Sequence, residues 1–113
     1  MEPRLHTGLS AERWHTLDIV EQLANVGSDV ERAIRAHETG RTDRRDHALA
    51  RALELFDLTA TDARWRGARR REVLRTREYF CRLFFDAETL EPGASAYLRS
   101  YFLQFAVAAR RTR

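Results

Sequence analysis

Apolar residues recur at helical spacing along most of the chain, and this pattern predicts helices without strands. The first such stretch begins at Ser10 or Thr16, both plausible N-caps, and continues to about Thr39. Its apolar and small positions repeat every three, four or seven residues, as in an amphipathic helix. Gly27 lies inside this stripe, where glycine weakens a helix, so we expect a neighbouring helix to approach closely there. Gly40 supplies the C-terminal stop.

Three further segments have the same periodicity and are separated by short polar, glycine- or proline-containing connectors. For the second segment, either Thr42 or Asp43 is the expected N-cap. Four helices with short connectors predict an all-α fold, specifically an up-down-up-down four-helix bundle. The three segments are about Asp43–Thr61, Asp62–Phe85 with a candidate break at Gly67, and about Ala94–Arg110.

The length of 113 residues indicates one domain. Residues 1–9 contain Pro3 and Gly8 and show no periodicity, so we expect a flexible N-terminal arm followed by a single domain over residues 10–113. No apolar run approaches the roughly 20 residues of a membrane span. The N-terminus also lacks a hydrophobic signal core. The expectation is a cytoplasmic protein without a membrane partner.

All 20 basic residues are arginine and none is lysine. A GC-rich genome explains such a bias, because its codons favour arginine. Selection for bidentate contacts to phosphate or carboxylate also explains it, and the two causes are compatible. The formal net charge is only +3, so any strongly basic surface must come from an uneven distribution of charge.

The densest cluster of arginine is the stretch RWRGARRR. In an up-down bundle this stretch shares one end with both chain termini, and we call that end the basic pole. Helix N-terminal amides and arginine both favour phosphate, and an indole can stack on a base, so the basic pole is a candidate site for RNA or DNA. The alternative is a solvated charged turn closed by the indole. The candidate residues are Arg64, Trp65, Arg66, Arg69, Arg70, Arg71, Arg110 and Arg111.

Arg77 lies within an apolar stripe that includes Leu74 and Phe80. A buried arginine needs an acidic partner. Glu31 falls unexpectedly within the apolar stripe of the first helix, so we expect a buried ion pair between Arg77 and Glu31, with Asp57 or Glu54 as less central alternatives. Such a pair would fix the register of the helices.

Arg32 and His37 are separated by four residues, in RAIRAH. This spacing resembles the Arg-x4-His element of HEPN-type ribonucleases, which are also helical bundles. The resemblance implies RNA cleavage, or a component of a toxin–antitoxin pair, with Arg32 and His37 as catalytic candidates. It covers six residues and lies on the first long helix, whereas the family carries it on a later one. The alternative is that His37 interacts with the dipole at its helix end.

Neither a metal nor another cofactor is expected. Glu12 and His15 form one Glu-x-x-His pair, whereas carboxylate-bridged di-iron bundles need two such pairs and two more glutamates. Phosphate-binding glycine-rich loops are also missing from the sequence. Cys81 lies on an apolar stripe and is expected to be a small core residue.

Leu58, Leu103 and Val107 lie outside the main apolar stripes of their helices. A four-helix bundle needs only one apolar face on each helix, so surplus apolar residues indicate an interface. We expect the chain to form a homo-oligomer or to bind a protein partner through these three residues.

Three stretches, WHTLDIVEQLANVGSDVERAI, RALELFDLTATDARWRG and YFLQFAVAAR, resemble a group of small uncharacterised prokaryotic all-α proteins. In architecture alone, the chain is similar to four-helix bundles encoded in ribosomal-RNA intervening sequences and to the Avd-like bundles that assist retroelement reverse transcriptases. The Avd-like resemblance implies a pentamer with basic surfaces for nucleic acid, as a fold-level analogy. The sequence thus favours a non-enzymatic binding or assembly module over an enzyme. A HEPN-like ribonuclease and a purely structural subunit remain the alternatives.

Overall fold

The computed structural model describes residues 11–86 and 93–111, and both ranges are helical. The predicted N-terminal arm lies outside the described residues. Four long helices carry the fold, together with one short helix and one 3-10 turn. The elements are α1 (Ala11–Trp14), α2 (Ile19–Glu38), α3 (Thr42–Ala60), the 3-10 helix η1 (Ala63–Trp65), α4 (Ala68–Phe85) and α5 (Ala94–Arg111).

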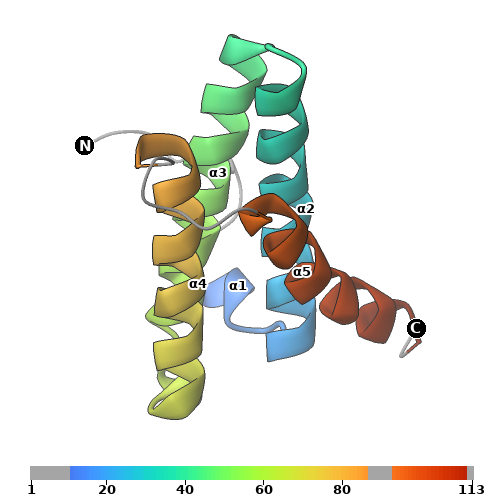
Figure 1. Cartoon of the computed structure of the whole chain (residues 1–113). Coiled ribbons are helices and arrows are strands. Elements are labelled where there is room, and N and C mark those ends of the chain that lie inside the picture. Colours follow the sequence, from blue (N-terminus) through green and yellow to red (C-terminus); the bar gives the residue numbers. More distant parts are fainter. Residues whose placement is uncertain (1–10, 87–92, 112–113) are drawn as a thin grey trace.

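Each long helix packs mainly on two others. α2 packs on α3 and α5, and α4 packs on the same two helices (Figure 1). Successive long helices run in opposite directions, but α5 crosses α2 at an angle and its C-terminal end projects away from the other helices. The all-α prediction is confirmed. The regular up-down-up-down bundle is not confirmed, because α5 diverges along its length.

Asp18, and not Thr16, caps α2. The Asp18 side chain accepts a hydrogen bond from the Glu21 backbone N–H at 2.8 Å, and Glu21 Oε1 accepts one from the Asp18 N–H at 3.4 Å. This reciprocal arrangement is a capping box. The prediction for Thr16 is wrong because its hydroxyl donates instead to the Arg13 carbonyl at 2.7 Å. Ser10 lies outside the described residues.

The start of α3 also differs from the prediction. Arg41 occupies the N-cap position and makes no capping hydrogen bond with its side chain, while Thr42 and Asp43 already belong to the first helical turn. Gly40 precedes them with a φ of +70°, a left-handed conformation that suits glycine, and the predicted stop there is confirmed. The first turn of α3 therefore keeps backbone N–H groups without a side-chain partner.

The expected break at Gly67 is confirmed, and it separates η1 from α4 with a φ of +82°. Asp62 caps η1, accepting a hydrogen bond from the Arg64 backbone N–H at 3.0 Å, and it does not cap α4. The third helix therefore begins at Ala68, six residues after Asp62.

Three phenylalanines from α3, α4 and α5 meet at the centre of the core. Phe56 and Phe80 are fully buried and Phe102 is 4% exposed. The Phe56 ring lies 5.8 Å from the Phe80 ring and 6.0 Å from the Phe102 ring, centroid to centroid. α2 completes the core with apolar residues at helical spacing, namely Leu23, Val26, Val30, Ala33 and Ile34.

The crossing of α2 and α5 depends on Gly27. A Cβ atom added there would lie 2.6 Å from Phe102 Cβ and 2.9 Å from Phe102 Cγ. Only a residue without a side chain allows this approach, so the expected close contact at Gly27 is confirmed. Within the described ranges, no helix combines the length and the apolar character required to cross a membrane.

Candidate functional site

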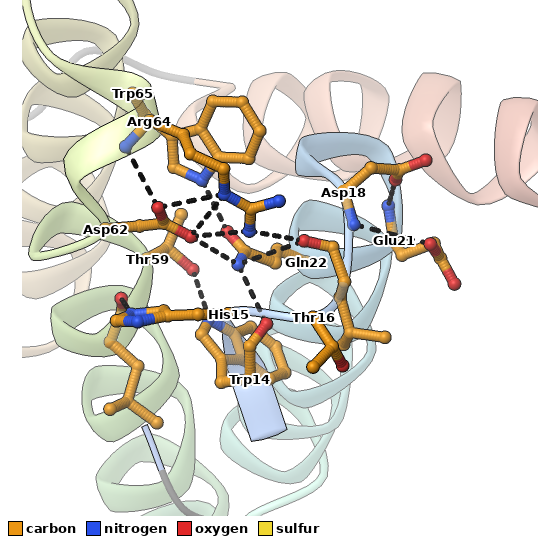
Figure 2. A network of polar contacts seen from close by, with 12 residues as sticks. Trp14, His15, Thr16, Asp18, Glu21, Gln22, Thr59, Asp62, Arg64 and Trp65 are labelled. Carbon is orange, nitrogen blue, oxygen red and sulfur yellow. Dashed lines mark hydrogen bonds and ion pairs between the residues drawn. The ribbon is translucent and has the colours of Figure 1, made fainter. Parts of the chain in front are cut away.

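A buried polar network occupies the region where the basic pole was expected (Figure 2). Its centre is Asp62, whose side chain is 3% exposed. Arg64 donates to Asp62 through Nε at 3.1 and 3.2 Å and through Nη2 at 2.7 Å, and Nη2 also reaches the Leu17 carbonyl at 2.6 Å. These hydrogen bonds from Arg64, which outweigh the effect of burial, hold the pKa of Asp62 well below its ordinary value.

Gln22 extends this network across α2. Its side-chain nitrogen donates to Asp62 Oδ2 at 3.1 Å and to the Trp14 carbonyl at 3.0 Å. Its oxygen accepts from Trp65 Nε1 at 2.8 Å. Trp14 Nε1 in turn donates to Thr59 Oγ1 at 3.1 Å. The network thereby joins α1, α2, α3 and η1, and Trp65 serves to hold these elements together.

Several arginines of the basic pole already have partners within the fold. The Arg64 guanidinium is paired with Asp62 and lies 4.5 Å from the centroid of the Trp65 ring. Arg69 pairs with Glu72 at 3.3 Å, and Arg70 donates to the Asp62 carbonyl at 3.5 Å. By contrast, Arg66 and Arg71 are exposed. Two of the five arginines of this stretch are therefore paired with carboxylates of the fold, and a third contacts a backbone carbonyl.

Arg110 and Arg111 do not join this cluster. They lie at the C-terminal end of α5, which Figure 1 places on the opposite side of α2 from the start of α4. The expectation that they gather with Arg64–Arg71 at one end of a regular bundle is wrong, because the inclination of α5 carries its last turn away.

The predicted buried pair between Arg77 and Glu31 is also wrong. Arg77 Nε donates to Asp57 Oδ1 at 2.9 Å, and the two side chains are 34% and 61% exposed. Asp57 was one of the alternative partners. Neighbouring Leu74 is 46% exposed and Thr76 is buried, so Arg77 lies at the rim of the α4 core face. Close by, burial raises the pKa of the Cys81 thiol, consistent with an unreactive side chain.

Glu31 instead joins α2 to α5 through Arg99, an interaction that the sequence analysis missed. Arg99 Nε donates to Glu31 Oε2 at 2.7 Å, and Arg99 Nη2 donates to Glu38 Oε1 at 2.8 Å. The two carboxylates are separated by seven residues, two turns of one helix, so one guanidinium can reach both. This spacing was the available signal for the interaction.

Arg32 and His37 are not brought into one site. Five residues along a helix correspond to about 140° around its axis. Arg32 Nη1 donates to Asp29 Oδ1 at 2.8 Å, whereas the His37 ring packs against Phe84 of α4 with centroids 5.3 Å apart. The two catalytic candidates therefore contact different surroundings.

The three residues of the expected interface are exposed to different degrees. Leu103 is 58% exposed on α5, and Val107, one turn later, is partly buried. Leu58 is partly buried and packs against the main core, so it also contributes to the fold of the single chain. Of the three residues, Leu103 is therefore the most exposed.

A further concentration of basic side chains lies around a cavity between α2 and α3. A surface pocket of about 630 Å³, which we call the hairpin groove, lies beside the connection between these helices. Asp29 and Asp43 are the acids that line it, so five arginines against two aspartates leave a formal charge of +3. The basic residues lining it are Arg32, Arg35, Arg41, Arg44, His47 and Arg51.

Three of these arginines have no acidic partner among the described residues. Arg32 pairs with Asp29, and Arg35 lies 3.7 Å from Glu31. In contrast, the structure gives the side chains of Arg41, Arg44 and Arg51 no ion pair or hydrogen bond within residues 11–86 and 93–111, and the Nε of Arg51 is buried. A buried unpaired donor typically costs about 1–3 kcal/mol. This region is therefore suited to receive an anionic or hydrogen-bond-accepting ligand.

The backbone adds to this electrostatic preference. The N-terminus of α3, whose cap lacks a side-chain hydrogen bond, begins beside Arg41, Asp43 and Arg44, all of which line the groove. Free N–H groups and the helix dipole favour anions at this position.

The sequence contains a signal for the hairpin groove that the analysis passed over. Arg44, His47 and Arg51 repeat at helical spacing on α3, and Arg32 and Arg35 do so on α2. The connector between the helices by itself predicts only a polar turn. Once the two helices are paired about Gly40, both basic rows face the same pocket.

Across the part of the chain that the structure describes, no cluster of three or more His, Cys, Asp or Glu side chains could hold a metal ion.

Comparison of the chain with protein-family models, with curated proteins and with solved structures finds no match.

Proposed function

We propose that the protein is a non-enzymatic helical binding module that contacts RNA or DNA through the arginines of the hairpin groove. The observation that supports this proposal is the set of three arginines, Arg41, Arg44 and Arg51, that have no acidic partner among the described residues but line one pocket. Arginine makes bidentate hydrogen bonds to phosphate oxygens, which makes it suitable for this ligand.

The contrast with the basic pole strengthens the proposal. Arg64 and Arg69 have carboxylate partners within the fold, so a phosphate would have to compete with Asp62 and Glu72 for them. Arg41, Arg44 and Arg51 of the groove face no such competition from within the described residues. A phosphate that they bind replaces water and counterions only.

The proposal is tested by titrating the protein with single-stranded RNA and DNA at two salt concentrations. Neutralising phosphates releases counterions, so we expect affinity to fall steeply with salt. The triple variant Arg41→Ala, Arg44→Ala, Arg51→Ala is expected to bind at least about tenfold more weakly than the wild type, because each lost contact to the nucleic acid weakens binding.

A second triple variant, Arg66→Ala, Arg71→Ala, Arg75→Ala, removes the same formal charge from exposed positions around α4. We expect it to retain most of the affinity. If it loses as much as the groove variant, the groove assignment is wrong and general surface charge explains binding. Absence of any salt-sensitive binding by the wild type would contradict the proposed function itself.

A second candidate function is assembly, either as a homo-oligomer or with a protein partner. The observation that favours it is Leu103, whose side chain is 58% exposed. It borders a groove of about 490 Å³ between α2 and α5, which is also lined by the small residues Ala24, Gly27 and Ala106. An exposed leucine beside a shallow apolar groove provides both parts of a self-complementary contact.

Light scattering tests self-association. We expect the wild type to be larger than a monomer and Leu103→Glu to shift it toward the monomer, because a charge at a buried contact opposes association. Leu74→Glu is the matched control, since Leu74 is 46% exposed on α4. If the wild type is strictly monomeric at high concentration, the homo-oligomer hypothesis is wrong. If both variants have the same effect, the interface does not lie on α5.

A further inference from the structure

The hairpin groove has two chemically different ends. Because α2 and α3 are antiparallel about Gly40, residues close to Gly40 in sequence lie at one end, which we call the turn end. Residues distant from Gly40 lie at the other, the far end. Arg41 and Arg44 are at the turn end, and Asp29 and Arg51 are at the far end. The seven residues from Arg44 to Arg51 span about 10 Å along α3.

The turn end is suited to a single phosphate group. Two arginines without acidic partners among the described residues, Arg41 and Arg44, flank the first turn of α3, where backbone N–H groups have no side-chain cap. Arginine side chains and helix N-termini both bind phosphate oxygens. Asp43 also lines this end, so the site is less positive than the arginines alone would make it.

The far end, where Asp29 offsets one of two arginines, carries a smaller positive charge than the turn end and offers hydrogen bonds. Asp29 is 2% exposed, and its Oδ1 accepts from Arg32 Nη1 at 2.8 Å. Beside it, the buried Nε of Arg51 lacks a hydrogen-bond acceptor. A neutral group with acceptor atoms, such as a nucleobase, satisfies this donor without placing a negative charge next to Asp29.

The walls of the groove also include carbon surface. Ala36 and Ala48 are each 6% exposed and line the groove, where the aliphatic stem of Arg35 adds apolar surface. Bases bind to such surfaces by stacking and dispersion, independently of sequence.

We infer that the hairpin groove binds one unpaired nucleotide of a single strand, with its phosphate at the turn end and its base at the far end. This inference rests on the proposed function and narrows it to single-stranded nucleic acid. The volume of about 630 Å³ lies within the range of small-ligand pockets, roughly 300–1,000 Å³. A base that remains paired and stacked in a duplex cannot enter such a pocket, whereas an unpaired base can.

The test measures binding of the full chain to AMP, adenosine and inorganic phosphate by calorimetry. It also compares the affinity for a single-stranded oligoadenylate with the affinity for the duplex that this strand forms with oligouridylate. We expect AMP to bind about tenfold more tightly than either fragment, since only AMP reaches both ends of the groove. We also expect the single strand to bind about tenfold more tightly than the duplex.

Two variants test the orientation of the nucleotide. Arg44→Ala is expected to weaken the binding of AMP about tenfold and to change the affinity for adenosine by less than about twofold, because it removes only a contact to the phosphate. Arg51→Leu is expected to weaken the binding of AMP and of adenosine by the same factor, because it removes a contact to the base that both ligands carry. Arg75→Ala on α4 is the control for charge, and circular dichroism checks that each variant is folded.

The outcomes separate this inference from the proposed function. If single strand and duplex bind equally, or AMP binds no better than phosphate, the nucleotide inference is wrong and the groove is only an anion site for nucleic acid. If Arg44→Ala weakens adenosine as much as AMP, the orientation is wrong. If no nucleic acid binds at all, both the inference and the proposed function are wrong.

Discussion

Gly27→Ala is expected to lower the free energy of unfolding by about 2 kcal/mol, although alanine is the better helix former by about 1 kcal/mol. The added methyl group would lie 2.6 Å from Phe102 Cβ. Because Cβ is fixed to the backbone, relief requires α5 to move away from α2, and this separates packed core residues. Urea unfolding followed by circular dichroism measures the loss.

Ser28→Ala is the matched control for Gly27→Ala. Ser28 is the next residue of α2 and is exposed, so we expect its replacement to change stability by less than about 0.5 kcal/mol. Phe102→Ala should rescue Gly27→Ala only in part, since alanine keeps the Cβ atom that lies nearest. A Gly27→Ala protein as stable as the wild type would show that α2 and α5 do not cross as closely as described.

Asp62→Ala is expected to destabilise the protein by about 3 kcal/mol, the lower end of the range for removing one partner of a buried ion pair. The change leaves Gln22 Nε2 without one acceptor and removes the main partner of Arg64. The lower end applies because the Arg64 side chain is 41% exposed and can turn toward water. The readout is again urea unfolding.

Asp57→Ala is the control, since it removes an Asp–Arg pair whose carboxylate is 61% exposed. Exposed pairs contribute about 0–1 kcal/mol, so this variant should lose much less stability than Asp62→Ala. Equal losses from both variants would contradict the structural role assigned to the network around Asp62.

The lowered pKa of Asp62 also predicts acid sensitivity. In the unfolded chain Asp62 takes up a proton near its ordinary pKa of about 4, whereas in the folded protein it does so at lower pH. The stabilisation is therefore present above about pH 4 and is lost as pH falls toward the folded pKa. We expect Asp62→Asn to flatten the decline of stability between about pH 5 and 2. If the stability of Asp62→Asn falls with pH as steeply as that of the wild type, the pKa of Asp62 is not lowered in the folded protein.

Local features of the chain were predicted well because they depend on neighbouring residues. The apolar periodicity located all four long helices, and the stops at Gly40 and Gly67 follow from glycine's access to positive φ. The position of Gly27 within an apolar stripe predicted a close crossing of two helices. Capping was predicted less well, because the Thr16 hydroxyl donates to the Arg13 carbonyl and Arg41 occupies the cap position in place of Thr42.

The partners of charged residues were predicted poorly. Arg77 pairs with Asp57 and Glu31 pairs with Arg99, because the rotation of each helix decides which side chains meet. A turn of one residue moves a side chain about 100° around the axis. In α4, burial of Thr76 shifts Leu74 and Arg77 to the rim of the core face. Periodicity alone does not resolve a rotation of this size.

The sequence by itself determined the helical class, the approximate helix ranges, the excess of arginine and the need for a small residue at position 27. Only the tertiary structure decided which arginines are neutralised. Arg64 belongs to the densest basic stretch of the sequence, but its charge is paired with Asp62. Arg44 and Arg51 belong to a less dense pattern, but both line the hairpin groove. The physical reason is that formal charge belongs to a residue, whereas the charge available to a ligand depends on the distance to every other charge once the helices have packed.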